Sequence, residues 1–251
     1  MRRYSTYLFD LDGVVYRGSE PISGAIETLN ALRDADIVFV TNNSSLTRTE
    51  YARKLRTMGF ECEPSQFYTS ASATATWIAN EMPNATAYVV GSPGLIAELE
   101  QAGIRIGEDS DFVVVGIDRD FTYDKLDAAQ SAIRKGARFI ATNLDSTYPA
   151  DGGRIQPGAG SLVAAVAAAS GQSPIGMGKP ETRIVQSLID RADWSPHDCL
   201  VVGDRMDTDI ELAYRLGCDS ALVLTGVSNG LGLDPHPTYV IDRLQKLLQF
   251  D

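Results

Sequence analysis

Short apolar runs alternate with longer amphipathic segments along almost the whole of this sequence. The apolar runs are rich in Val, Ile, Leu and Phe, as at 37–40, 112–116 and 199–202. Segments with one apolar face at helical spacing stand between them, as at 47–58 and 123–135. Strands that are separated by helices cannot pair through short hairpins. The alternation therefore predicts an α/β fold with a mainly parallel sheet.

The same patterns give the remaining elements. Further strands are expected at 4–9, 87–90, 138–141, 221–224 and 239–241, and further helices at 24–33, 71–81, 93–101, 162–169, 181–191, 208–216 and 244–250. A long polar loop is expected at 143–155. The chain has 251 residues, enough for one large domain or two modest ones. The middle block, in which the rhythm of strands and helices repeats, reads as a small α/β domain inserted within a larger one.

Two carboxylates, Asp10 and Asp12, end the first predicted strand. Residues two apart in an extended segment point the same way, so these side chains can converge just past the strand end. In open α/β sheets ligands bind at that edge. A hard divalent cation such as Mg²⁺ relieves the repulsion between crowded carboxylates. The alternative is an acidic turn, since Asp12-Gly13 is a common turn pair.

Further polar groups close other strands or begin a helix of the same predicted sheet. They are Thr41 with Asn42 and Asn43, Lys179, and Asp204 with Asp209. Each has an ordinary structural explanation as a cap, a surface lysine or a helix N-terminal acid. Together at the strand ends they suit phosphoryl transfer: cations neutralise phosphate, one carboxylate attacks phosphorus and another moves protons.

The composition excludes some classes of partner. The formal net charge is −11, which disfavours nucleic acid and anionic membranes, because both are negatively charged. Three cysteines without C-x-x-C spacing indicate neither a disulfide framework nor a zinc site. The sequence shows no apolar signal segment and no apolar run long enough to span a bilayer, so we expect a soluble cytoplasmic protein.

The basic residues are five lysines and seventeen arginines. An acidic, lysine-poor surface is compatible with a high-salt environment, although the base composition of the genome would also favour arginine. The high-salt hypothesis predicts that folding and activity depend on molar salt, and indifference to salt would reject it.

Four motifs, in order, make the chain resemble the haloacid dehalogenase (HAD) superfamily of phosphatases. Within it, the chain is similar to the class IIA group of NagD-like and p-nitrophenyl phosphatase-like enzymes. The first motif, D-x-D-G, matches Asp10-Leu11-Asp12-Gly13. The second, a strand-end Thr or Ser, matches Thr41, and the third, a lysine, matches Lys179. The fourth, G-D-x-x-x-T-D, matches Gly203-Asp204 through Thr208-Asp209.

The resemblance implies a role for each matching residue. Asp10 would be the nucleophile that forms an aspartyl-phosphate, and Asp12 the general acid/base. Mg²⁺ would be held by the Asp10 carboxylate, the backbone carbonyl of Asp12 and Asp204, with Asp209 in support. The phosphoryl group would be bound by Thr41, Lys179 and the backbones of Asn42 and Asn43. Family dehalogenases lack an acid at the Asp12 position, so its presence favours a phosphatase.

The resemblance also implies a domain organisation. The insert lies between the second and third motifs, as in the family's larger cap type, and we place it at 78–175. Residues 1–77 and 176–251 would form the HAD catalytic core, a Rossmann-like doubly wound parallel sheet. The inserted α/β cap would contact the leaving group. Asp145 and Asn143, in the polar loop of the cap, are candidates for substrate contact, and a solvated surface loop is the alternative.

The sequence therefore predicts a Mg²⁺-dependent phosphomonoester hydrolase that acts on a small phosphorylated metabolite, whose identity the sequence does not give. One alternative is a phosphotransferase or phosphomutase with the same intermediate, recognisable by alcohol-dependent turnover without phosphate release. Another is a non-catalytic small-molecule binding module on the same fold, which the intact motifs argue against. A homodimer is an expectation from the family alone.

Overall fold

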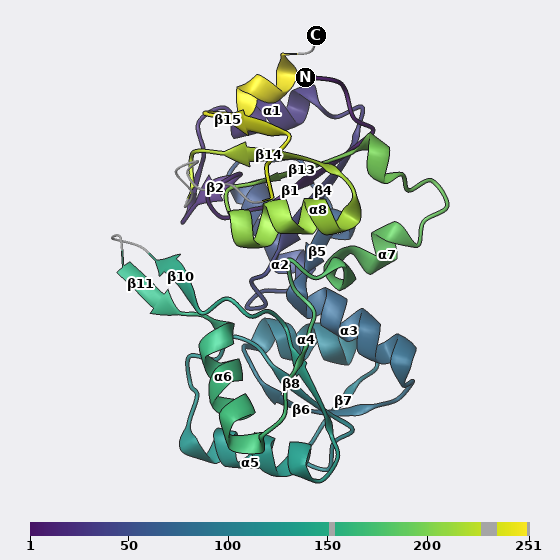
Figure 1. Cartoon of the computed structure of the whole chain (residues 1–251), viewed down its shortest axis with the longest axis vertical. Coiled ribbons are helices and arrows are strands. Elements are labelled where there is room, and N and C mark those ends of the chain that lie inside the picture. Colours follow the sequence, from purple (N-terminus) through teal and green to yellow (C-terminus); the bar gives the residue numbers. More distant parts are fainter. Residues whose placement is uncertain (151–153, 227–234, 250–251) are drawn as a thin grey trace. The chain divides into compact units, whose positions relative to one another are not determined.

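The computed structural model describes residues 1–150, 154–226 and 235–249 of the chain. The chain divides into two compact units (Figure 1). The first unit contains Met1–Thr41, Thr49–Tyr68 and Lys179–Asp251, and the second contains Asn42–Arg48 and Thr69–Gly178. The expected cap boundary at residue 78 falls inside helix α3 (Ser70–Glu81), whereas the second unit takes in that helix from its start. The assignment of the second unit as a cap stays a prediction.

A six-stranded sheet organises the first unit, in the order β15-β14-β13-β1-β4-β5. Its strands are β1 (Thr6–Phe9), β4 (Asp36–Thr41), β5 (Phe67–Thr69), β13 (Cys199–Gly203), β14 (Asp219–Val223) and β15 (Tyr239–Ile241). β1 lies between β4 and β13 and runs parallel to both. The buried side chains of Leu8 and Phe9 explain the apolar run of the first predicted strand. The predicted parallel α/β fold is confirmed.

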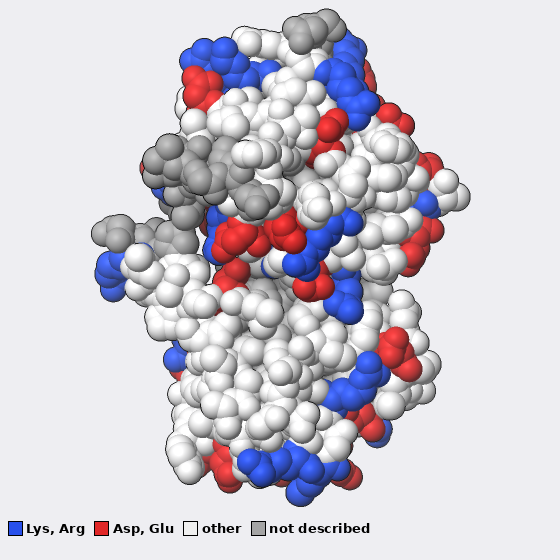
Figure 2. Space-filling model, in the orientation of Figure 1, with Lys and Arg blue, Asp and Glu red and all other residues white. Residues whose placement is uncertain are grey.

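The helices of the first unit are shorter than the sequence pattern suggested. They are α1 (Ala25–Ala31), α2 (Arg48–Thr57, which begins at the last residue of a second-unit segment), α7 (Gln186–Ile189) and α8 (Glu211–Leu216). α8 packs against β13 and β14. Arg215 of α8 forms ion pairs with Glu211 and Glu181. Acidic and basic side chains lie next to one another on the face of the molecule that Figure 2 shows. A small antiparallel ribbon, β2 (Tyr16–Arg17) and β3 (Glu20–Pro21), follows β1.

The second unit has its own parallel sheet, in the order β12-β9-β8-β6-β7. Its strands are β6 (Thr86–Val90), β7 (Arg105–Ile106), β8 (Phe112–Val115), β9 (Arg138–Ala141) and β12 (Ile175–Gly176). Its helices are α3, α4 (Pro93–Gln101), α5 (Tyr123–Arg134) and α6 (Ala159–Ser170). Alternate residues of β8 face opposite sides: Phe112 and Val114 join one apolar cluster with α3 and α4, and Val113 and Val115 join another with α5 and α6. Burial on both faces explains the continuous apolar run of this strand.

The expectation of a polar loop at 143–155 is wrong over part of its length. An antiparallel hairpin of β10 (Thr147–Ala150) and β11 (Arg154–Pro157) occupies it, with a register from Thr147↔Pro157 to Ala150↔Arg154. Residues 151–153 lie outside the described residues. The hairpin escaped prediction because its strands contain no continuous apolar run, and Ile155 of β11 is 74% exposed. Backbone pairing and a hydrogen bond from the Tyr148 hydroxyl to Gln156 Oε1 join its two strands, and neither leaves an apolar period in the sequence.

Three predicted helices take other forms. The segment expected as a helix at 181–191 is a 3₁₀ helix (Thr182–Val185) followed by the single turn α7. The one expected at 208–216 begins as a π-helical turn (Met206–Ile210) before α8. The C-terminal helix is 3₁₀ over Leu244–Leu248, and residue 250 lies outside the described part. Apolar spacing does not separate these helix types over so few residues.

Candidate active site

Asp10 stands directly after β1, the central strand of the first unit. Its backbone N–H donates a 2.9 Å hydrogen bond to the carbonyl of Val202 in β13, so the backbone is still held by the neighbouring strand there. The side chain is 13% exposed. The sheet thus fixes a nearly buried carboxylate at the carboxyl edge of its parallel strands, where open α/β sheets bind their ligands.

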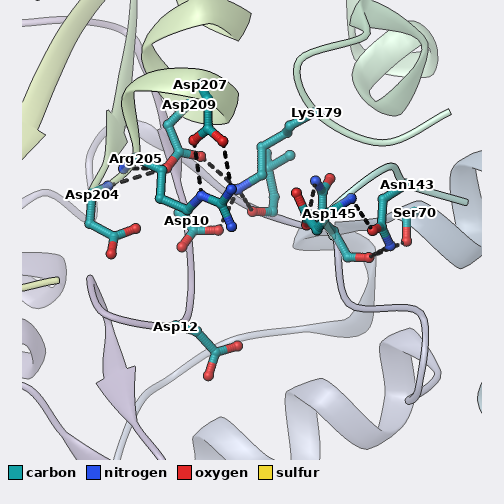
Figure 3. Close-up of polar contacts among 12 residues, drawn as sticks. Asp10, Asp12, Ser70, Asn143, Asp145, Lys179, Asp204, Arg205, Asp207 and Asp209 are labelled. Carbon is teal, nitrogen blue, oxygen red and sulfur yellow. Dashed lines mark hydrogen bonds and ion pairs between the residues drawn. The ribbon is translucent and has the colours of Figure 1, made fainter. Parts of the chain in front are cut away.

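Lys179 joins three acceptors in this region (Figure 3). Its Nζ atom donates to Asp10 Oδ1, to Asp209 Oδ1 at 2.7 Å and to the backbone carbonyl of Val40 at 3.1 Å. The side chain is buried. Burial alone would lower the pKa of Lys179, but the charges of Asp10 and Asp209 outweigh it and raise that pKa above its ordinary value. The lysine is therefore a fixed positive charge beside Asp10.

Asp209 ties this lysine to the loop that follows β13. Its Oδ2 atom accepts hydrogen bonds from the backbone N–H groups of Asp204 at 3.2 Å and Arg205 at 3.1 Å. The backbone of Gly203 approaches it so closely that a Cβ atom there would lie 2.1 Å from the Cβ of Asp209. Asp209 is buried and accepts hydrogen bonds from Lys179 and from the backbone N–H groups of Asp204 and Arg205. With its oxygens occupied in this way, Asp209 is better suited to support a metal site than to bind the ion directly.

Asp10, Asp204 and Asp209 can each place one carboxylate oxygen within 4.8 Å of the other two. Hard oxygen donors in such a group match the ligand preference of Mg²⁺. Two glycines make room around Asp204: a Cβ atom at Gly13 would lie 2.7 Å from its Oδ2 atom, and one at Gly226 only 1.8 Å. Gly13 also has a φ of +89°, which favours glycine. The donor set and the space beside it fit a divalent cation.

The carboxylate of Asp12 lies apart from this group, as Figure 3 shows. It accepts a 3.1 Å hydrogen bond from the hydroxyl of Tyr16, and the Nζ atom of Lys54 stands 3.7 Å from the centre of the Tyr16 ring. Burial raises the pKa of Asp12, although the charge of Lys54 and the Tyr16 hydrogen bond oppose that rise. The spacing in the sequence suggested that the side chains of Asp10 and Asp12 converge on one point. The structure instead directs Asp12 to Tyr16, because β1 ends at Phe9 and the chain bends at Leu11.

The second predicted motif spans the boundary between the two units. Thr41 ends β4 in the first unit and is buried, and Asn42 and Asn43 belong to the second unit. Within the second unit, Asn42 Nδ2 donates to Asp145 Oδ2 at 3.0 Å. The carbonyl of Asn42 accepts from Asn143 Nδ2 at 2.7 Å and from Ser70 Oγ at 2.6 Å. The candidate residues Asp145 and Asn143 are therefore bonded to the residue that directly follows Thr41.

Sequence reasoning missed Tyr16, Lys54 and Ser70. Tyr16 follows Val14 and Val15 in a short apolar stretch, and Lys54 occupies an ordinary polar position of α2. No spacing in the sequence links either of them to Asp12. Arg205 was unassigned as well, and it forms a two-pronged ion pair with Asp207, with nitrogen–oxygen distances of 3.0 and 2.7 Å.

Family profiles match both ends of the chain. The haloacid dehalogenase-like hydrolase profile matches residues 7–105, and a HAD-hydrolase-like profile matches residues 176–247. The two matches contain all four motifs identified above. Among the described residues, no helix combines the length and the apolar character needed to cross a membrane.

Curated relatives align with nearly the whole chain. The acid sugar phosphatase of Staphylococcus haemolyticus is 40% identical over 246 residues, with 95% of this chain and 93% of the relative covered. The 5'-nucleotidase YutF of Bacillus subtilis is 39% identical over 256 residues, and both chains are covered completely. The similarity therefore extends across both compact units.

Solved structures of phosphatases also match nearly the whole chain. The p-nitrophenyl phosphatase from Archaeoglobus fulgidus superposes with a TM-score of 0.91 at 33% identity, covering 98% of each chain. The glycerol phosphate phosphatase from Mycobacterium tuberculosis, in complex with magnesium, superposes with a TM-score of 0.91 at 36% identity. The match covers 99% of this chain and 77% of that one. The chain thus belongs to the haloacid dehalogenase-like hydrolases, in their NagD-like class IIA group, and is a phosphatase that acts on phosphorylated substrates.

Proposed function

We propose that this phosphatase is a Mg²⁺-dependent phosphomonoester hydrolase that works through an aspartyl-phosphate on Asp10. The observation that carries the proposal is the buried ammonium group of Lys179, held between the Asp10 and Asp209 carboxylates at the end of β1. A phosphoryl group that reaches Asp10 meets this positive charge beside the nucleophile. Fixed charges of this kind stabilise the charge that develops during phosphoryl transfer.

The proposed metal ligands are the carboxylates of Asp10 and Asp204 and the backbone carbonyl of Asp12, with Asp209 in support. Bound there, Mg²⁺ would act as a Lewis acid toward the phosphoryl oxygens and offset the repulsion between carboxylates. The mycobacterial relative was solved in complex with magnesium, which supports this choice of ion. The carboxylate cluster described above supports the position.

In the first step, a carboxylate oxygen of Asp10 attacks phosphorus while the bond from phosphorus to the substrate oxygen breaks. The carboxyl group of Asp12 gives its proton to the departing alcohol. In the second step, the Asp12 carboxylate takes a proton from a water molecule that attacks phosphorus. The bond from phosphorus to Asp10 then breaks and inorganic phosphate leaves, and the proton taken from water has returned Asp12 to its acid form. Lys179 and Thr41, with the backbones of Asn42 and Asn43, would hold the phosphoryl oxygens.

The proposed substrate is a small phosphate monoester of an alcohol. Relatives are named for sugar phosphates, for nucleotides and for glycerol phosphate, and these substrates share an alkyl leaving group. Such a group needs a proton, which agrees with an acid at position 12. We propose that the second unit is the specificity cap and that Asp145 contacts the leaving group. Cytoplasmic location and a homodimer stay predictions.

The test is phosphate release from a panel of phosphate monoesters by wild-type protein, with Mg²⁺ and with chelator, and with Asp10→Asn as the blank. The proposal predicts metal-dependent release that the blank lacks, with one alkyl phosphate well above the others. Alcohol-dependent turnover without phosphate release would assign a phosphotransferase instead. Folded protein that turns over no compound with Mg²⁺ present would reject the hydrolase.

A further inference from the structure

Tyr16 is a fully buried tyrosine with no part in the reaction steps above. Its hydroxyl donates a 3.1 Å hydrogen bond to the Oδ2 atom of Asp12. Tyr16 is buried and its hydroxyl has this carboxylate as partner, so the bond is costly to lose and restricts how the Asp12 carboxylate can turn. The pair therefore bears on the geometry of the proposed acid/base.

The backbone brings these two residues together. The carbonyl of Leu11 accepts hydrogen bonds from the N–H groups of Val15 at 2.9 Å and Tyr16 at 3.2 Å. The N–H of Gly13 donates to the carbonyl of Tyr16 at 2.9 Å. These bonds close a tight turn after β1 and return Tyr16 to the side of Asp12. The backbone hydrogen bonds of this turn therefore place Tyr16 beside Asp12.

The ring of Tyr16 is fixed from a second direction. Lys54, in α2 of the same unit, places its Nζ atom 3.7 Å from the ring centre, which is a cation–π contact. Because the hydroxyl faces Asp12 and the ring face is covered by Lys54, the phenol has little freedom to move. A fixed donor of this kind can hold one oxygen of the Asp12 carboxyl group and leave the other oxygen, Oδ1, to exchange protons.

We propose that Tyr16 is a positioning residue that fixes the orientation of the Asp12 carboxyl group for proton transfer to the leaving oxygen and from water. The inference rests on the proposed function, since it requires Asp12 to be the general acid/base. Its physical basis is that proton transfer depends steeply on the placement of the donor. Removal of the Tyr16 hydroxyl should therefore lower kcat only for substrates whose leaving group needs a proton.

The test compares Tyr16→Phe with wild type on two substrates, glycerol phosphate and p-nitrophenyl phosphate. We expect kcat for glycerol phosphate to fall by about tenfold or more, with KM little changed, because proton transfer contributes about 10²–10⁴-fold. The kcat for p-nitrophenyl phosphate should stay near wild type, since its leaving group departs without a proton. That substrate also shows that the variant is folded.

Tyr4→Phe is the matched control. The hydroxyl of Tyr4 also donates to a carboxylate, Asp219 Oδ2 at 2.8 Å, and Tyr4 is likewise buried in the first unit. Its removal should leave the ratio of the two rates unchanged. A second measurement introduces Tyr16→Phe into Asp12→Ala: with the acid gone, the tyrosine has nothing to position, so no further loss on glycerol phosphate is expected.

Equal losses on both substrates, no loss, or a gain with glycerol phosphate would each overturn the role of Tyr16, as would a full additional loss in the Asp12→Ala background. These results require a wild-type protein that releases phosphate. Folded wild-type protein that releases no phosphate from any monoester of the panel would refute the proposed function itself, so the two failures are distinguishable; if another alkyl phosphate of the panel is turned over faster than glycerol phosphate, it takes the place of glycerol phosphate in this test.

Discussion

The Nζ atom of Lys179 lies 2.7 Å from the Oδ1 atom of Asp209, and the same ammonium group also donates to Asp10. The other oxygen of Asp209 accepts from the backbone N–H groups of Asp204 and Arg205. Asp209 therefore connects the lysine to the loop after β13, and Lys179 connects that loop to the end of β1. The charges of the site are arranged before any substrate binds.

Replacing Lys179 with methionine should damage both catalysis and stability. The variant leaves the Asp10 and Asp209 carboxylates without their shared cation, and loss of one partner from a buried ion pair costs about 3–5 kcal/mol. We expect kcat to fall by at least about 10²-fold, because a fixed charge beside the phosphoryl group is lost. Steady-state kinetics and denaturant unfolding in chelator measure the two effects.

Mg²⁺ should raise the unfolding midpoint of Lys179→Met, since a cation that binds only the folded state stabilises it. Lys135→Met, a change at an exposed lysine, is the control, and it should alter neither kcat nor the free energy of unfolding. A Lys179→Met protein with wild-type stability and rate would contradict this account of the cluster.

Replacing Asp12 with alanine should separate substrates by leaving group. We expect kcat to fall by about 10²–10⁴-fold for an alkyl phosphate and far less for p-nitrophenyl phosphate, because only the first needs a proton from Asp12. Parallel kinetics on the two substrates measure the difference. The same loss on both would show that Asp12 does not act as the acid.

The dependence of kcat on pH should also differ between the alkyl phosphate and p-nitrophenyl phosphate. Burial raises the pKa of Asp12 above its usual value of 3.8, against the charge of Lys54 and the hydrogen bond from Tyr16. A raised pKa means that the acid form persists to higher pH. We therefore expect kcat for an alkyl phosphate to fall as pH rises through that pKa, and kcat for p-nitrophenyl phosphate to fall less. Identical profiles for the two substrates would count against the assignment.

Stability of the second unit should depend on Glu98, a buried carboxylate of α4. It accepts from the backbone N–H of Arg48 at 2.7 Å and from its guanidinium at 3.1 Å. Glu98→Ala should lower the free energy of unfolding by about 1–3 kcal/mol, because hydrogen bonds to a charged group are lost. Chemical denaturation measures it. Glu81→Ala, which breaks the exposed pair with Arg138, is the control and should cost less than about 1 kcal/mol. Equal costs would contradict the prediction.

The alternation of strands and helices was readable in the sequence because the core strands are buried on both faces. Continuous runs such as Phe112–Val115 and Cys199–Gly203 coincide with β8 and β13. The hairpin β10–β11 and the two-residue strands β2 and β3 were not predicted. The strands β2 and β3 have only two residues each, and the strands β10 and β11 contain no continuous apolar run, so neither pair leaves a readable period in the sequence.

The candidate site was predictable to the extent that its residues follow strands. Asp10, Asp204 and Asp209 come together with Lys179 because β1 and β13 are neighbours in the sheet. The hydrogen bond from Tyr16 to Asp12 was not predictable, since it depends on the turn closed on the carbonyl of Leu11. The same holds for the bond from Asn42 to Asp145, which joins residues 103 positions apart.

The covalent step on Asp10 is the central claim, and acid quenching during turnover tests it most directly. Wild-type protein and Asp10→Asn are mixed with Mg²⁺ and the best substrate, quenched in acid and analysed by peptide mass mapping. The account predicts one phosphoryl group on the peptide that contains Asp10 in wild type, and neither adduct nor phosphate release in Asp10→Asn, which should remain folded. Phosphate release by Asp10→Asn at the wild-type rate, or a phosphoryl group found on another residue, would contradict it.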